Sequence, residues 1–254
     1  MFLQNYLRIT TTDKIQGTKI YLNLTKEFDN FDYEASINKI KEIHKYGQLF
    51  HMIEDPERSA LCREDPKLKL LLKRLKDFDT SSIRPLIVKL YILFYENKTD
   101  SFYNCLSVIE SYIARQKIIN MSNTTLNRFI LIYLPKLKGN EESPDEFLKS
   151  IFLKTESETD KWPDDEQVID AFKKLTFSPK SFQKIRKYIH TTLRRIEHFI
   201  SNKESLDLSD TTKYTIEHIM PSTLTPEWKN NLGENCQKIY SEYLNNYGNL
   251  TIQL

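Results

Sequence analysis

The chain has 254 residues, of which 39% are hydrophobic, so it can bury a core in one large domain or two smaller ones. Only five residues are glycine and no two lie close together, which excludes a dinucleotide-binding fingerprint, a phosphate-binding P-loop and a nucleophile elbow. Lys and Arg number 37 against 35 Asp and Glu, and the net charge of +2 gives no general argument for nucleic acid or membrane binding. Low glycine with many Leu, Ile, Lys and Glu residues predicts a mainly α fold.

Three cysteines, Cys62, Cys105 and Cys236, are far apart and lack CxxC spacing, which argues against a disulfide framework or a structural zinc site. No N-terminal segment has the apolar core of a signal peptide, and the best apolar run contains Lys89. We therefore expect a cytoplasmic protein that does not bind membranes.

Apolar residues recur every three or four positions through the first 200 residues, which predicts a series of amphipathic helices. Asp100 and Ser101 form a candidate capping region before one of them. The helical stripes occupy residues 83–94, 106–113 and 126–133, and further helices are predicted over residues 34–53, 66–76, 144–153, 163–176 and 180–201.

An acidic trio, Asp164, Asp165 and Glu166, follows Pro163. Three adjacent carboxylates could bind a metal ion. In the first turn after a proline, however, carboxylates complement the helix dipole. We therefore predict that a helix begins here.

The predicted helix over residues 180–201 carries apolar residues on one face and basic residues on another. Such a basic face could follow the phosphate backbone of a nucleic acid, although a solvated helix surface is the commoner explanation. The candidate backbone-binding residues are Lys184, Lys187, Arg194 and Arg195.

The pattern changes after about residue 205, which predicts a helical domain over 1–205 and a small second domain over 206–254. Residues 213–219 and 247–252 are rich in β-branched and aromatic side chains and predict two short strands. Between the strands we expect a loop that contains Pro226, Trp228 and Gly233, followed by a short helix over about 235–244.

A carboxylate and an imidazole are adjacent where the first of these strands ends, at Glu217 and His218. An imidazole can take a proton from water, and a carboxylate is a hard oxygen ligand for a divalent cation. The pair is therefore a minimal set for metal-assisted hydrolysis, although a histidine at a strand end is more often structural.

The C-terminal region resembles the HNH, or His-Me finger, domain of the GmrSD-type restriction endonucleases. In that family a Glu/Asp-His-Ile-x-Pro strand is followed some thirty residues later by a Gly-Asn-Leu-Thr-Leu strand. Here Ile216-Glu-His-Ile-Met-Pro221 precedes Tyr247-Gly-Asn-Leu-Thr251, with Trp228 between them, and Asn249 comes 31 residues after His218. The order, the spacing and the intervening tryptophan all agree with the family pattern.

Weaker similarities to the same family extend along the helices. Leu3-Gln-Asn-Tyr-Leu7 resembles the segment that follows the family's N-terminal nucleotide-binding domain. Glu110-Ser-Tyr112 and Thr125-Leu-Asn127 resemble a helical pair in which Gln116 replaces the usual second arginine. Trp162-Pro-Asp-Asp165 and Leu193-Arg-Arg-Ile-Glu197 also have counterparts in the family's helical linker.

The two segments Ile216–Pro221 and Tyr247–Thr251 are together called the tail motif, and the resemblance implies roles for three of its residues. His218 would be the general base that activates water against a phosphodiester, and Glu217 would bind a divalent metal, Mg²⁺ or Mn²⁺. Asn249 would hold the histidine or support the site from the second strand. The fold implied is a multi-helix domain followed by a truncated ββα-metal unit with a short β hairpin.

Two parts of the family's architecture have no counterpart in this sequence. They are the N-terminal nucleotide-binding domain and the helix that closes the finger with another metal ligand. A divalent ion held by one side chain and waters binds weakly. We therefore expect little or no nuclease activity from this chain by itself.

Two functions stay open at this stage. The first is a piece of a metal-dependent DNA endonuclease of type IV restriction and phage defence, with foreign DNA, including DNA with modified cytosine, as the target. The absent nucleotide-binding domain would be a partner. The second is a non-catalytic helical interaction module that carries a degenerate HNH remnant. An RNA-binding helical repeat is disfavoured because no repeat period is present.

Overall fold

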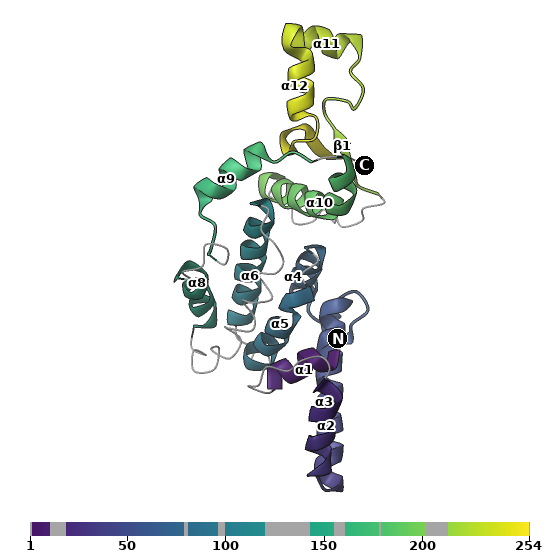
Figure 1. The fold of residues 1–254 in the computed structure, drawn as a ribbon, viewed down its shortest axis with the longest axis vertical. Helices are drawn as coiled ribbons and strands as arrows, with labels where there is room; N and C mark the ends of the chain where they lie inside the picture. The colour runs from purple at the N-terminus through teal and green to yellow at the C-terminus, as the bar shows by residue number, and fades with distance from the viewer. Residues whose placement is uncertain are drawn as a thin grey trace. The chain divides into compact units, whose positions relative to one another are not determined.

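The computed structural model describes residues 2–10, 19–78, 81–95, 100–119, 143–154, 161–177, 179–201 and 213–253. These residues are mainly helical, with one small two-stranded antiparallel sheet, which confirms the predicted fold class (Figure 1). The chain forms two compact units, Met1–Trp162 and Pro163–Leu254. The domain boundary predicted at residues 205/206 lies outside the described residues.

The first unit contains helices at all the predicted positions that the structure describes. Its stripe over residues 83–94 divides into α5 and a π-helical turn, Tyr91–Tyr95, and the helix predicted over residues 126–133 lies outside the described part. Two helices, α1 and α2, were not predicted. The bounds are α1 (Phe2–Thr10), α2 (Ile20–Asp29), α3 (Tyr33–Glu54), α4 (Pro66–Asp77), α5 (Arg84–Leu90), α6 (Ser101–Ile118) and α8 (Pro144–Lys154).

An aromatic cluster attaches α8 to α6. The rings of Tyr112 and Phe152 stack with their centroids 4.0 Å apart, and Trp162 lies 6.0 Å from Tyr112. The Trp162 amide donates to the Phe152 carbonyl at 2.8 Å, and the Gln116 side chain donates to the Lys161 carbonyl at 2.9 Å. Gln116 stands where the GmrSD-type pattern has its second arginine. It is buried, and its hydrogen bond holds residues 161 and 162, at the end of the first unit, against α6.

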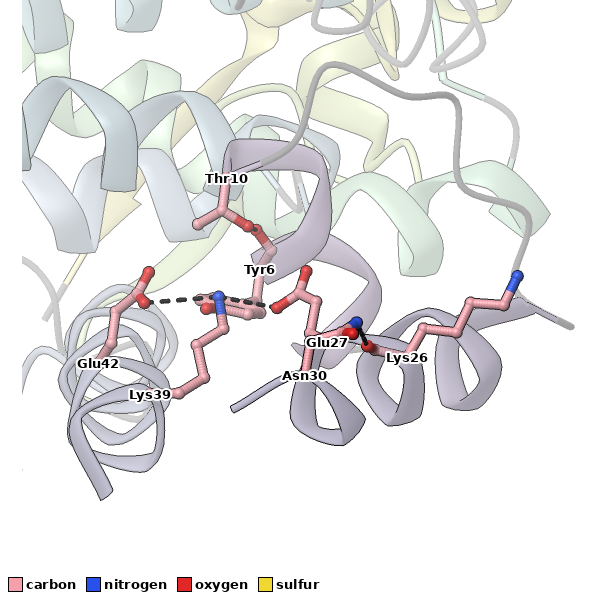
Figure 2. A network of polar contacts seen from close by, with 7 residues as sticks. All are labelled: Tyr6, Thr10, Lys26, Glu27, Asn30, Lys39 and Glu42. Carbon is pink, nitrogen blue, oxygen red and sulfur yellow. Dashed lines mark hydrogen bonds and ion pairs between the residues drawn. The ribbon is translucent and has the colours of Figure 1, made fainter. Parts of the chain in front are cut away.

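A polar network joins α1, α2 and α3 (Figure 2). Figure 2 shows the Lys39 ammonium between two carboxylates, 2.9 Å from Glu27 and 3.6 Å from Glu42. The same ammonium lies 5.5 Å from the centroid of the buried Tyr6 ring. Burial alone would lower the pKa of Lys39, but its hydrogen bonds with Tyr6 and Glu27 raise that pKa above its ordinary value. Lys39 therefore stays charged and connects three helices.

The second unit begins at the helix start that was predicted after Pro163. The Asp164 side chain accepts from the Gln167 amide at 2.7 Å, and the Gln167 side chain accepts from the Asp164 amide at 3.1 Å. This capping box, with Asp165 and Glu166 in the first turn, confirms that a helix begins here. The elements are α9 (Asp165–Lys174), α10 (Pro179–Ser201), β1 (Thr215–His218), α11 (Pro226–Leu232), α12 (Cys236–Tyr243) and β2 (Leu250–Gln253).

The loop predicted between the strands is wrong for α11. Pro226 occupies the first helical turn, and the Thr225 hydroxyl accepts from the Trp228 amide at 3.3 Å as the N-cap. Gly233 ends the helix with φ of +69°, in the left-handed region that glycine adopts without strain. Proline at the start and glycine just past the end of a segment are typical of helix boundaries as well as of loops, and here they bound a helix.

The two strands pair antiparallel, with Ile216 opposite Ile252 and His218 opposite Leu250. Ile216 and Leu250 are buried in a cluster with Phe177, Ile189 and Tyr247, so the segment after α9 and the helix α10 supply the surface on which the hairpin packs. The buried His190 on α10 adds a polar contact, its Nε2 lying 3.1 Å from the Tyr214 carbonyl just before β1.

None of the helices in the described part of the chain combines the length and the apolarity of a bilayer-spanning segment.

Candidate active site

His218 is the last residue of β1, and its imidazole is half-buried. Its Nε2 lies 3.2 Å from the side-chain Oδ1 of Asn245. Asn245 follows α12, so the two residues meet although 27 positions separate them in the sequence. The antiparallel hairpin is the physical reason, because it returns the chain to the end of β1 just before β2 begins.

Asn249 lies at the same end of the hairpin, is 7% exposed and fixes the backbone that follows His218. Its Oδ1 accepts from the Met220 amide at 2.6 Å, and its Nδ2 donates to the carbonyls of Met220 at 3.1 Å and Leu244 at 2.8 Å. Its own carbonyl accepts from the Ile219 amide at 2.9 Å. The side chain therefore joins the turn after β1 to the end of α12, and the contact with the imidazole comes from Asn245 instead.

The neighbouring Asn246 anchors this strand end to α9. Its Nδ2 donates to the carbonyls of Lys173 at 2.8 Å and Leu175 at 3.3 Å, and its Oδ1 accepts from the Gly248 amide at 2.9 Å. Asn245 contributes through its backbone carbonyl, which accepts from the Phe177 amide at 2.9 Å. The segment that carries the imidazole partner is thus held on two sides.

Tyr247 packs in the apolar cluster that also buries Ile216 and Leu250 of the hairpin. Its ring stacks on Phe172 with a centroid distance of 4.4 Å and meets Phe177 edge-on at 5.0 Å. Burial raises the pKa of Tyr247 to about 12, opposed by its hydrogen bond with Thr192. Tyr247 is therefore neutral at physiological pH and acts as a buried packing residue.

Glu217, the predicted metal ligand, is exposed and lies next to His218 along β1. Its Oε1 accepts from the Thr215 hydroxyl at 3.0 Å, and residues two apart on a strand share a face. Adjacent residues on a strand point to opposite faces, so the carboxylate lies on the face opposite that of His218. Within the ranges that the structure describes, no group of three or more His, Cys, Asp or Glu side chains could hold a metal ion.

The candidate basic residues on α10 differ in exposure. Arg195 is exposed, whereas Arg194 is only 5% exposed, a position that favours a structural contact. The side chains of Lys184 and Lys187 lie outside the described part. Of the two arginines in this set whose side chains the structure describes, Arg195 is the exposed one.

Sequence reasoning missed Asn245, which contacts the imidazole. Its only sequence signal is its place in a run of asparagines just before the Tyr-Gly-Asn motif. Such a run is ordinary in a chain rich in asparagine, so the contact between β1 and the segment before β2 was needed to single out this residue.

Residues 162–253 match the family model described as GmrSD restriction endonucleases, C-terminal domain. The match begins next to Pro163, where the second compact unit begins, and includes both strands and helices α9 to α12. It supports the GmrSD-type family for this part of the chain and suggests a member of a restriction endonuclease family. No curated protein and no solved structure matches the chain.

Proposed function

We propose that the second unit contributes the nuclease domain of a DNA endonuclease that cleaves modified or foreign DNA in type IV restriction and phage defence. One observation supports this proposal above the others. The family match coincides with a compact unit in which His218 and Asn249 lie at the same end of one hairpin. The helical first unit would join this domain to a nucleotide-binding partner domain.

His218 is the proposed general base. Its imidazole takes a proton from a water molecule whose oxygen attacks the phosphorus of a phosphodiester. The bond from phosphorus to the new oxygen forms as the bond to the departing sugar oxygen breaks. The sugar oxygen takes up a proton from solvent water, and His218 later releases its proton to solvent. Asn249 supports this step by fixing the backbone at Ile219 and Met220, which sets where β1 ends and where its histidine lies.

The described residues do not by themselves make up a divalent-metal site. Glu217 bonds to Thr215 on the strand face opposite His218, and a Mg²⁺ site needs several converging oxygen ligands. The metal dependence that the resemblance implies therefore requires ligands beyond Glu217, from substrate phosphates or from residues other than those that the structure describes. We assign no step of the reaction to a metal ion.

The position of Glu217 favours a second candidate function. In this candidate, the carboxylate of Glu217 and the imidazole of His218 lie on opposite faces of β1 and do not act on one substrate, so the hairpin is a structural remnant. The chain is then a non-catalytic interaction module made mainly of helices.

A nicking assay with the protein isolated from its native cells separates the two functions. Supercoiled plasmid with and without modified cytosine is incubated with Mg²⁺ or Mn²⁺. We expect His218→Ala to lower the nicking rate by about 100-fold or more, since a general base contributes about 10²- to 10⁴-fold. His44→Ala removes an exposed histidine of α3 as the matched control and should change the rate less than about twofold.

The 254-residue chain alone is expected to nick at background level. Equal rates for His218→Ala and the parent protein would exclude His218 as the base. No nicking by any form of the intact protein would favour the interaction module.

A further inference from the structure

We propose that Asn245 is a positioning residue that fixes the tautomer and the ring orientation of His218. The inference rests on the proposed function for its role in catalysis, but the contact itself is a property of the fold. It concerns a residue outside the tail motif.

The contact between Asn245 and His218 has a defined polarity. An amide Oδ1 is a hydrogen-bond acceptor, and it lies 3.2 Å from Nε2 of the imidazole. A neutral imidazole carries one proton, so a proton on Nε2 for donation to Asn245 leaves the lone pair on Nδ1. Asn245 therefore determines that Nδ1 is the basic nitrogen of His218.

The segment that carries Asn245 is held in place by hydrogen bonds of its neighbours. The preceding carbonyl, of Leu244, accepts from Asn249, and the carbonyl of Asn245 accepts from the Phe177 amide. The following residue, Asn246, is buried and bonded to two carbonyls at the end of α9. These hydrogen bonds hold three consecutive residues, so the backbone position from which the Asn245 side chain extends is fixed.

The backbone that carries the imidazole is held in place as well. His218 pairs with Leu250 across the hairpin, and the amide of the next residue, Ile219, donates to the Asn249 carbonyl. A hydrogen bond between two fixed backbones costs little additional ordering. The imidazole is therefore held in one orientation before the substrate binds.

Nuclear magnetic resonance of the 254-residue chain with ¹⁵N-labelled histidine rings tests the tautomer without any enzymatic activity. The spectra are recorded at about pH 8.5, above the ordinary imidazole pKa of about 6.5. A His218→Gln spectrum assigns the His218 signals. We expect His218 to carry its proton on Nε2, with a slowly exchanging Nε2 proton protected by the bond to Asn245.

Three variants give the proposal its controls. Asn245→Leu removes the acceptor and should abolish the protected proton and give averaging of the two ring tautomers. Asn245→Asp keeps an acceptor and should retain the Nε2–H form. Asn231→Leu changes an exposed asparagine of α11 and should leave the His218 signals unchanged. A proton on Nδ1 in the parent chain, or unchanged His218 signals in Asn245→Leu, would overturn the inference.

The nicking assay then tests the catalytic consequence. In the intact protein Asn245→Leu is expected to lower kcat about 10- to 100-fold with KM nearly unchanged, and Asn245→Asp to restore most of it. If the resonance results hold and no form nicks DNA, the positioning contact stands and the proposed function fails. If nicking depends on His218 but not on Asn245, the function stands and the positioning role fails.

Discussion

Asp65 performs two tasks with one side chain. Its Oδ1 accepts from the Leu68 amide at 2.8 Å as the N-cap of α4, and its Oδ2 accepts from the hydroxyls of Tyr95, at 2.9 Å, and Tyr103. Burial by itself would raise the pKa of Asp65, but the hydrogen bonds from Tyr103, Leu68 and Tyr95 outweigh burial and lower it. Asp65 therefore connects the start of α4 to the π-helical turn and to α6.

Asp65→Ala should lower the free energy of unfolding of the first unit by about 2–3 kcal/mol, because it removes a cap and leaves two hydroxyls without their acceptor. Asp32→Ala is the matched control. Asp32 caps α3 through the Ala35 amide at 2.7 Å in an exposed position, and its loss should cost about 1 kcal/mol. Urea denaturation followed by Trp162 fluorescence in a Trp228→Phe background measures the first unit.

The stabilisation by Asp65 depends on pH in a definite direction. Since the folded pKa lies below the unfolded value of about 3.9, the carboxylate contributes fully above that pH and loses its contribution as pH falls through the folded pKa. The difference between the parent chain and Asp65→Ala should therefore shrink in acid. Equal losses for Asp65→Ala and Asp32→Ala at pH 7 would show that the tyrosine contacts add nothing.

At the scale of elements, the contact between α6 and α8 depends on aromatic packing. Phe152 is 1% exposed and stacks on Tyr112, whereas Leu153, the next residue of α8, is 60% exposed. Adjacent residues of one helix thus face the core and the solvent.

Phe152→Ala should destabilise the first unit by about 3–5 kcal/mol, because it removes a buried ring and leaves a cavity. Leu153→Ala keeps the same helix and should change stability by less than about 0.5 kcal/mol. The same Trp162 fluorescence in urea reports both, since Trp162 belongs to this cluster. Comparable stability of the two variants would show that the stacking contact does not hold α8.

The proposed contact with DNA predicts how the affinity for DNA depends on salt and on an exposed basic residue. Arg195 is exposed on α10. If it neutralises a phosphate, Arg195→Ala should reduce the slope of log affinity against log salt by about 0.9 and weaken binding uniformly across sequences. Fluorescence anisotropy with duplex DNA between about 50 and 200 mM salt measures this slope.

Lys174→Ala removes the same charge from an exposed position at the end of α9. It is expected to leave the slope unchanged. A slope unaffected by Arg195→Ala would remove α10 from the proposed DNA surface and support the solvated-helix explanation of its basic face.

Elements with a local cause could be predicted from the sequence. Apolar spacing predicted α3, α4, α6 and α10, and the acidic turn after Pro163 predicted the start of α9, because helix periodicity and capping act within a few residues. The same spacing is present at Phe2, Tyr6 and Ile9, and it could have predicted α1.

β-branched and aromatic side chains predicted the two strands, and the adjacent carboxylate and imidazole of Glu217 and His218 singled out the end of the first strand. Which side chains meet at the end of β1 depends on contacts between distant parts of the chain. Asn245 lies 3.2 Å from the imidazole of His218 although 27 positions separate the two residues. Glu217 is next to His218 in sequence, but it accepts a hydrogen bond from Thr215 on the opposite face of the strand. The physical reason is that a strand turns adjacent side chains apart, whereas antiparallel pairing brings distant residues together.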